Sequence, residues 1–289
     1  MTASQSIAPL PIELWDIIIR LSVPPSGLGR GIEYPWIDSH RRREQDRELH
    51  KQRNFSINRL SQVCWPWREL LSTVRNQDLR ITRAGRLSLT LLLEEYDRNP
   101  RLFKETQRIR VHFPIKEAIS FLISFVQGIS SLTTLELIID NVVDASGLFK
   151  PLRDHLPAIL DATPSLIWLD IEDPIEFDPI GVLSTDMIGR FSDAGRHLRC
   201  LSCSIGFDYP YALNNAPSFP HLEILRIAIR CDWSGHGTNE WFKRWELPLV
   251  KQLSFHGYTP WPAYGVNLDL LLDNNIPNLE VLDIRVGRH

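Results

Sequence analysis

The chain has too few cysteines for a disulfide-stabilised fold and no cysteine spacing typical of a zinc site. Its 289 residues include four cysteines, of which only Cys200 and Cys203 lie close together. An odd offset places such a pair on opposite faces of an extended strand, and no second pair stands at zinc spacing. We therefore expect no disulfide framework, no metal site and no cofactor.

The chain also lacks a strong charge of either sign. Its formal net charge is −3, so no overall field attracts nucleic acid or an anionic membrane. The basic cluster at Arg41 to Arg43 has acidic neighbours and no interleaved aromatic residues, which argues against nucleic-acid binding. We expect neither nucleic acid nor a membrane among the partners.

No segment has the composition of a membrane span or a secretory signal. The stretch Ala118 to Leu135 is uncharged but rich in serine and threonine, and its apolar residues fall on one helical stripe, which predicts a packed amphipathic helix. The first apolar run carries Glu13 and Asp16, and no basic segment precedes it. We therefore expect a cytoplasmic and/or nuclear protein.

Residue arrangements that would carry catalysis are also missing. No Ser/His/Asp set and no paired carboxylates recur at a spacing that would place a catalytic group. The glycines at 27, 29 and 31 are followed by no Lys-Ser/Thr pair, so a phosphate-binding loop is not predicted. We expect a protein that is not an enzyme.

The sequence is rich in one repeated pattern, L-x-x-L-x-L, from residue 132 onward. Six copies have their second apolar anchor at positions 135, 169, 201, 225, 253 and 282. Residues 119–128, 152–160, 182–191 and 268–272 show helical apolar spacing between or beside these copies. A single unit of this kind cannot bury its apolar side alone, so stacked units are expected to share one core.

This pattern resembles the irregular leucine-rich repeat of the ribonuclease-inhibitor-like type. The resemblance implies an α/β solenoid over residues 76–289, in which short parallel strands on the concave face alternate with helices on the convex side. Cys203 replaces an inward aliphatic anchor, where a free cysteine behaves as a small hydrophobe. No polar cap follows Val286, so we expect either a truncated C-terminus or a final strand that is itself the edge.

Two motifs precede the repeats. The first is L-P-x-E-L at residues 10–14, where Pro11 suits a helix start and an apolar stripe runs on through Ile18 to Leu21. The second is L-x-x-V-C-x-x-W-R at residues 60–68, where Pro66 suits the first turn of a new helix. Both motifs therefore predict helices with an apolar face.

In this order the two motifs resemble the halves of an F-box, as found in fungal-type F-box proteins with leucine-rich repeats. The resemblance implies a helical module over residues 8–75, with an insertion at about 23–56 of the kind that many fungal members carry. It further implies docking onto a Skp-type adaptor on a cullin scaffold. The adaptor-binding residues would be Leu10, Pro11, Leu14, Ile18, Leu21, Leu60, Val63, Cys64 and Trp67.

By this resemblance the chain is the substrate-recognition subunit of an SCF-type ubiquitin ligase and itself transfers no ubiquitin. Its protein target is unknown, and the loop aromatics Trp233, Trp241, Trp245 and Trp261 are candidate target-binding anchors. Two alternatives stay open. These aromatics could instead pack over the repeat edges, and the helical module could be a plain cap on an adaptor-independent repeat scaffold.

Overall fold

The computed structural model describes residues 11–24, 39–81, 86–113, 116–139, 155–172, 183–206, 217–230, 245–257 and 276–286. The chain forms two compact units, Met1–Asp78 and Leu79–His289, which divide a few residues beyond the boundary expected at 75/76. The elements in chain order are α1 (Ile12–Ser22), α2 (Ser39–Leu60), α3 (Trp65–Asn76), β1 (Asp78–Ile81), α4 (Arg86–Arg98), the 3-10 helix η2 (Pro100–Phe103), β2 (Arg108–Phe113), α5 (Lys116–Gln127), β3 (Thr134–Ile139), β4 (Trp168–Glu172), β5 (Leu183–Ser184), α7 (Thr185–Ala194), β6 (Cys200–Gly206), β7 (Ile224–Arg230), β8 (Gln252–Gly257) and β9 (Val281–Val286).

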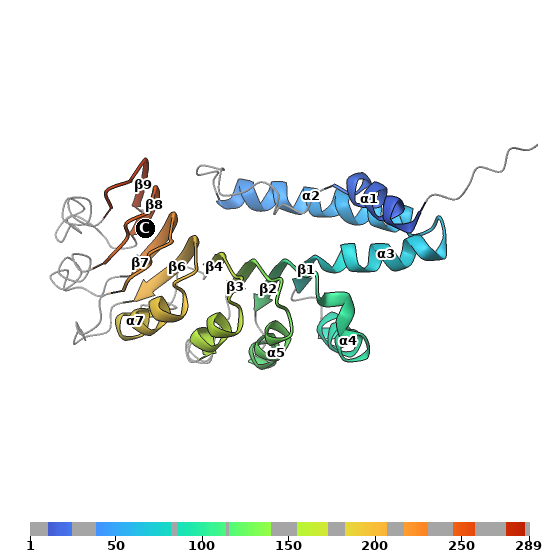
Figure 1. Ribbon diagram of the computed structural model, residues 1–289. Helices are drawn as coiled ribbons and strands as arrows, with labels where there is room; N and C mark the ends of the chain where they lie inside the picture. Colours follow the sequence, from blue (N-terminus) through green and yellow to red (C-terminus); the bar gives the residue numbers. More distant parts are fainter. Residues whose placement is uncertain are drawn as a thin grey trace, which may run out of the picture. The chain divides into compact units, whose positions relative to one another are not determined.

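The N-terminal unit contains the three helices α1, α2 and α3 (Figure 1). Pro11 precedes α1 as its N-cap residue, and the extended backbone of Cys64 precedes α3, which has Pro66 in its first turn. Proline is tolerated at these positions because the first N–H groups of a helix have no intrahelical acceptor. Both helix starts agree with the sequence prediction.

The predicted insertion is only partly separate from this unit. Helix α2 runs without a break from Ser39 to Leu60, so the part of the predicted insertion from 39 to 56 continues into the second motif. This helix is not simply solvated, since Asp46, Arg53 and Ile57 are buried on it. Residues 25–38 of the predicted insertion lie outside the described residues.

The C-terminal unit is a mixed α/β structure with an open, largely parallel sheet. Eight strands lie in the order β1-β2-β3-β4-β6-β7-β8-β9. The short strand β5 pairs with the C-terminal end of β6, whereas β4 pairs with its N-terminal end. The second anchors of the repeats are register partners across this sheet, in the pairs 135/169, 169/201, 201/225, 225/253 and 253/282. The alignment of the repeats by their second anchors therefore gives the register in which neighbouring strands pair.

The same backbone contact recurs at each step between strands. The carbonyl of Gln107 accepts hydrogen bonds from the N–H groups of Thr133 and Thr134, and the carbonyl of Thr133 accepts from Ile167 and Trp168. Equivalent bifurcated contacts follow at Ile167, Arg199, Glu223 and Lys251. Because every step repeats one contact at the strand entry, units of different length enter the sheet in one register.

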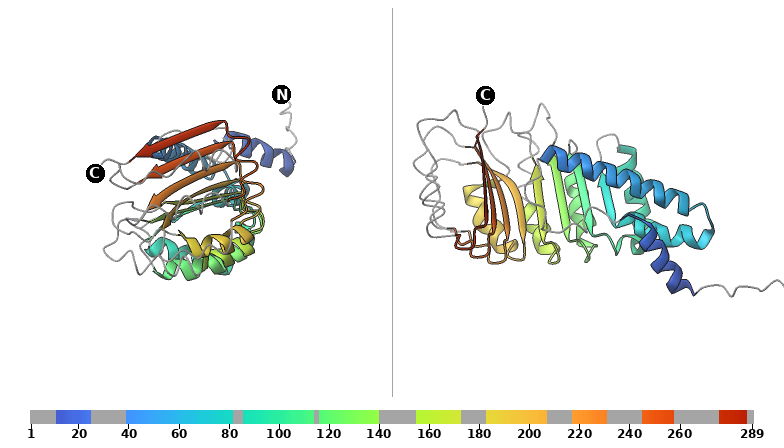
Figure 2. Two further views of the ribbon diagram at one scale, coloured as in Figure 1. Left: turned by 90° about the vertical axis from the view of Figure 1, so that its left-hand side faces the viewer. Right: turned by 90° about the horizontal axis from the view of Figure 1, so that it is seen from above.

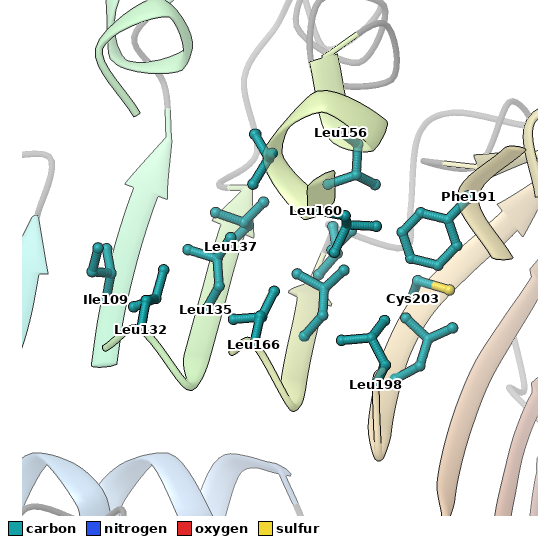
Figure 3. Packing of buried hydrophobic residues seen from close by; sticks show 14 of the residues in the cluster. Ile109, Leu132, Leu135, Leu137, Leu156, Leu160, Leu166, Phe191, Leu198 and Cys203 are labelled. Atoms are coloured by element: carbon teal, nitrogen blue, oxygen red, sulfur yellow. The ribbon is translucent and has the colours of Figure 1, made fainter. Parts of the chain in front are cut away.

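One continuous core lies between the sheet and its helices. Helices α4, α5, 155–162 and α7 stand in a row along one face of the strands (Figures 1 and 2). The anchor side chains of the strands point toward these helices, as Leu135, Leu137 and Cys203 do in Figure 3. Cys203 thus packs as the small hydrophobe that was predicted, in a cluster with Leu198 and Phe191.

Three of the four segments with predicted helical spacing coincide with helices of the structure. The fourth segment, residues 268–272, lies outside the described residues. The stretch from Ala118 to Leu135 is not one helix, however. Helix α5 ends at Gln127, and β3 begins at Thr134, because the L-x-x-L-x-L anchors of this segment follow strand alternation rather than helical periodicity. Among the helices that the structure describes, none is both long and apolar enough to cross a membrane.

The opposite face of the sheet carries a compact group of charged side chains. Arg108 and Arg110 on β2 flank Glu136 on β3, with 2.9 Å between Arg108 Nε and Glu136 Oε1 and 2.6 Å between Arg110 Nε and Glu136 Oε2. All three side chains are buried. The carboxylate therefore compensates two buried guanidinium groups across neighbouring strands.

Candidate functional site

Helix α1 has two apolar faces with different environments. One face carries Ile19, which is buried in a small core with Val23 just beyond the helix. The other face carries Leu14, Ile17, Ile18 and Leu21, whose exposed fractions lie between 38% and 82%. Their spacing of three and four residues places them on one stripe. The unit thus presents an uncovered apolar stripe next to its own core.

The buried face of α1 packs against α2 and α3. Ile57 of α2 and both Leu71 and Val74 of α3 complete the core that contains Ile19 and Val23. Leu60, Trp67 and Leu70 pack against this core from its margin. The ring centroids of Trp15 and Trp67 lie 5.1 Å apart at an interplanar angle of 56°, within the range that aromatic pairs prefer. This contact holds the start of α3 against α1.

A buried arginine ties the ends of two helices together. The Arg53 guanidinium on α2 donates to the carbonyl of Pro24 just after α1 at 2.9 Å, to the carbonyl of Val74 in α3 at 2.5 Å, and to Gln77 Oε1 at 3.2 Å. Burial lowers the pKa of Arg53 from its ordinary value, while the nearby charge of Asp78 opposes that shift. Arg53 thus donates to carbonyls near the ends of α1 and α3, and the carbonyl of Val74 also accepts a longer hydrogen bond, of 3.4 Å, from the N–H of Gln77.

The turn between α2 and α3 adds further exposed apolar surface. Val63 and Trp65 are 61% and 68% exposed, and the neighbouring Cys64 is also exposed. Trp65 lies two residues before Trp67, whose ring contacts Trp15 of α1. The exposed turn is therefore close to the N-terminal half of α1, where the apolar stripe begins.

The structure separates the predicted adaptor-binding residues into two groups. Pro11, Leu14, Ile18, Leu21, Val63 and Cys64 are exposed, whereas Leu60 and Trp67 pack against the helical core. Leu10 lies outside the described residues. The prediction omitted two exposed residues, Ile17 and Trp65. Helical spacing does place Ile17 on the stripe of Leu14, Ile18 and Leu21, but Ile17 is not one of the positions that match the motif.

Of the four predicted target-binding aromatics, the structure describes Trp245 alone, and this residue is buried. Trp245 is 1% exposed and belongs to the core of the C-terminal unit, where its ring centroid lies 6.2 Å from that of Phe219. The buried Trp245 offers no indole face to a target, so the prediction for this residue is corrected. Trp233, Trp241 and Trp261 lie outside the described residues.

Within the described ranges, no group of three or more His, Cys, Asp or Glu side chains could hold a metal ion. Comparison of the sequence with protein-family models gives no match, and comparison with curated proteins gives no significant match.

Proposed function

We propose that the chain is an F-box-type substrate receptor, which docks its helical unit onto a Skp-type adaptor of a cullin-based ubiquitin ligase. The observation that carries this proposal is the exposed apolar stripe of α1 on a helix whose other face already packs in a core. A helix of this kind suits docking into an apolar groove, with anchors at i, i+3, i+4 and i+7.

The size of the stripe suits a specific contact. Full burial of a Leu or Ile side chain is worth about 1.5–3 kcal/mol. Leu14, Ile17, Ile18 and Leu21 are together about half exposed, so covering them would contribute on the order of 5 kcal/mol before association costs. Val63 and Trp65 near the start of the stripe would add to this apolar surface.

The C-terminal unit would present the target. Its parallel strands in sequential order, with one repeated entry contact and helices along one face, support the interpretation as an irregular leucine-rich-repeat solenoid. In this role the chain is a non-catalytic subunit of the cytoplasm or nucleus. It accelerates ubiquitin transfer by holding a protein target near the conjugating enzyme.

Co-expression of the full chain with a Skp-type adaptor tests the proposal. The wild type should co-purify with the adaptor, and the double substitution Ile17→Asp/Leu21→Asp should abolish co-purification because both side chains point away from the core. Leu91→Asp is the matched control, since Leu91 is also a 58%-exposed helical leucine but lies in the C-terminal unit. Trp67→Ala is unsuitable for this purpose, because it removes part of the helical core.

A stable wild-type chain that does not bind the adaptor would refute the proposal. That outcome would favour the adaptor-independent repeat scaffold. Equal loss of adaptor binding in the double variant and in Leu91→Asp would also count against docking through α1.

A further inference from the structure

Arg226 on β7 is a charged side chain without a partner on the face of the sheet opposite the helices. Its neighbours Leu225 and Ile227 belong to the core, so strand alternation directs Arg226 to the other face. Among the described residues it forms no hydrogen bond and no ion pair, although its side chain is partly buried. A partly buried charge without an acceptor is costly, which makes Arg226 a candidate binding residue.

Two other arginines on this face have a carboxylate of their own. Arg108 and Arg110 on β2 share Glu136 on β3. Glu136 lies three strands away from β7 in the sheet, which corresponds to about 14 Å at the usual strand spacing. This carboxylate is therefore too far from Arg226 to compensate its charge.

The positions around Arg226 carry small side chains. Ser202 on β6 and Ser254 on β8 are its register partners, and Ala228 is the next residue of β7 on the same face. The Ser254 hydroxyl donates to Asp283 at 3.4 Å, whereas the Ser202 hydroxyl has no partner in the part of the chain that the structure describes. Small neighbours leave space around the guanidinium, and Ser202 adds a hydroxyl donor on the adjacent strand.

We propose that Arg226 binds the carboxylate side chain of an Asp or Glu in the protein target. This inference rests on the target-binding role proposed above for the C-terminal unit. A guanidinium donates two parallel hydrogen bonds to one carboxylate, and the Ser202 hydroxyl can donate a third. The occupant of this face is thus a protein segment that presents one acidic side chain to β7.

The charges in the same cross-strand row favour one carboxylate over a more strongly charged group. Asp170 on β4 and Asp283 on β9 each lie two strands from Arg226, or about 10 Å. One carboxylate neutralises Arg226, whereas a phosphate dianion would leave a negative charge between two acidic side chains. A run of acidic residues would meet the same repulsion. We therefore expect a single Asp or Glu with uncharged or basic neighbours.

Selection from a random peptide library on the immobilised full chain tests this inference. Peptides of about eight residues are long enough, because the strands from β4 to β9 span about 19 Å and an extended residue covers about 3.3 Å. Peptides enriched on the wild type should share one Asp or Glu position. Arg226→Glu should enrich Lys or Arg at that position instead, because the charge of the anchor is reversed.

Synthetic peptides from this selection give the change in affinity. Arg226→Gln should weaken binding at least about tenfold, and Arg226→Lys should recover part of the loss, because an ammonium group keeps the charge but lacks the planar fork. Arg190→Gln is the matched control, since this exposed arginine lies on α7, and it should bind like the wild type. The Arg226 variants should unfold at the denaturant concentration of the wild type, because the fold loses no hydrogen bond.

Three results would overturn the inference. They are a selection without a shared acidic position, an unchanged preference in Arg226→Glu, and tighter binding when phosphoserine replaces the acidic residue of the peptide. Docking of α1 is tested separately, because the selection contains no adaptor and Arg226 lies outside the helical unit. Arg226→Glu and the wild type should therefore give the same result in co-purification with a Skp-type adaptor.

Discussion

Replacement of the buried Arg53 should selectively destabilise the helical unit. Arg53→Met keeps the aliphatic stem but removes three hydrogen bonds, two of which satisfy the carbonyls of Pro24 and Val74. A buried carbonyl left without a donor costs about 1–3 kcal/mol, and removal of a desolvated charge offsets part of that cost. We expect a loss of about 1–3 kcal/mol, since the Pro24 carbonyl loses its donor while the Val74 carbonyl keeps the N–H of Gln77 at 3.4 Å.

Denaturant unfolding of the full chain, followed by tryptophan fluorescence, measures this effect because Trp15 and Trp67 are in contact inside the helical unit. Arg53→Lys should recover part of the loss, since an ammonium group can reach one of the carbonyls but not bridge both. Arg47→Met on the same helix is the control. Its side chain is exposed, so the expected change is within about 0.5 kcal/mol. Equal stability of the Arg47 and Arg53 variants would refute the role assigned to Arg53.

Three further outcomes follow from burial in the C-terminal unit. Glu136→Gln should cost about 3–5 kcal/mol in denaturant unfolding, because it removes the carboxylate charge that two buried arginines share, whereas Glu223→Gln beside the more exposed Arg199 should cost less than about 1 kcal/mol; similar costs would contradict the burial argument. Leu253→Ala should lower the free energy of unfolding by about 2–5 kcal/mol, and the exposed Leu249→Ala should change it by less than about 1 kcal/mol. Burial lowers the pKa of His197 below 6.5, so the folded state resists its protonation. The stability that His197 contributes should therefore fall as the pH drops below about 6.5, and NMR titration should give a lowered pKa; a raised value would contradict the assignment.

The repeat register could be read from the sequence because its determinants are local and chemically uniform. Five of the six second anchors are leucines that are buried at the same strand position, namely Leu135, Leu169, Leu201, Leu225 and Leu253. Strand alternation and the need to cover one apolar face are enough to align them. The prolines at 11 and 66 likewise marked helix starts, because the missing N–H of proline is tolerated there.

The parts that sequence reasoning missed depend on tertiary contacts. The spacing placed Ile18 on the apolar stripe of α1, but it did not indicate that the neighbouring Ile19 is buried in a core with α2 and α3. Arg53 lies within the predicted insertion, and its burial depends on its hydrogen bonds to residues near the ends of α1 and α3. Trp245 lies outside the strands, as expected, but its burial beside Phe219 depends on a contact between separate repeats.

Hydrogen–deuterium exchange of the full chain, with and without a Skp-type adaptor, tests the central claim most directly. The docking account predicts slower exchange over residues 12–22 of α1 and over the turn at 60–67. It also predicts unchanged exchange in the strands β3 to β8. Slower exchange confined to the C-terminal unit, or no change anywhere at saturating adaptor, would contradict docking through the exposed stripe of α1.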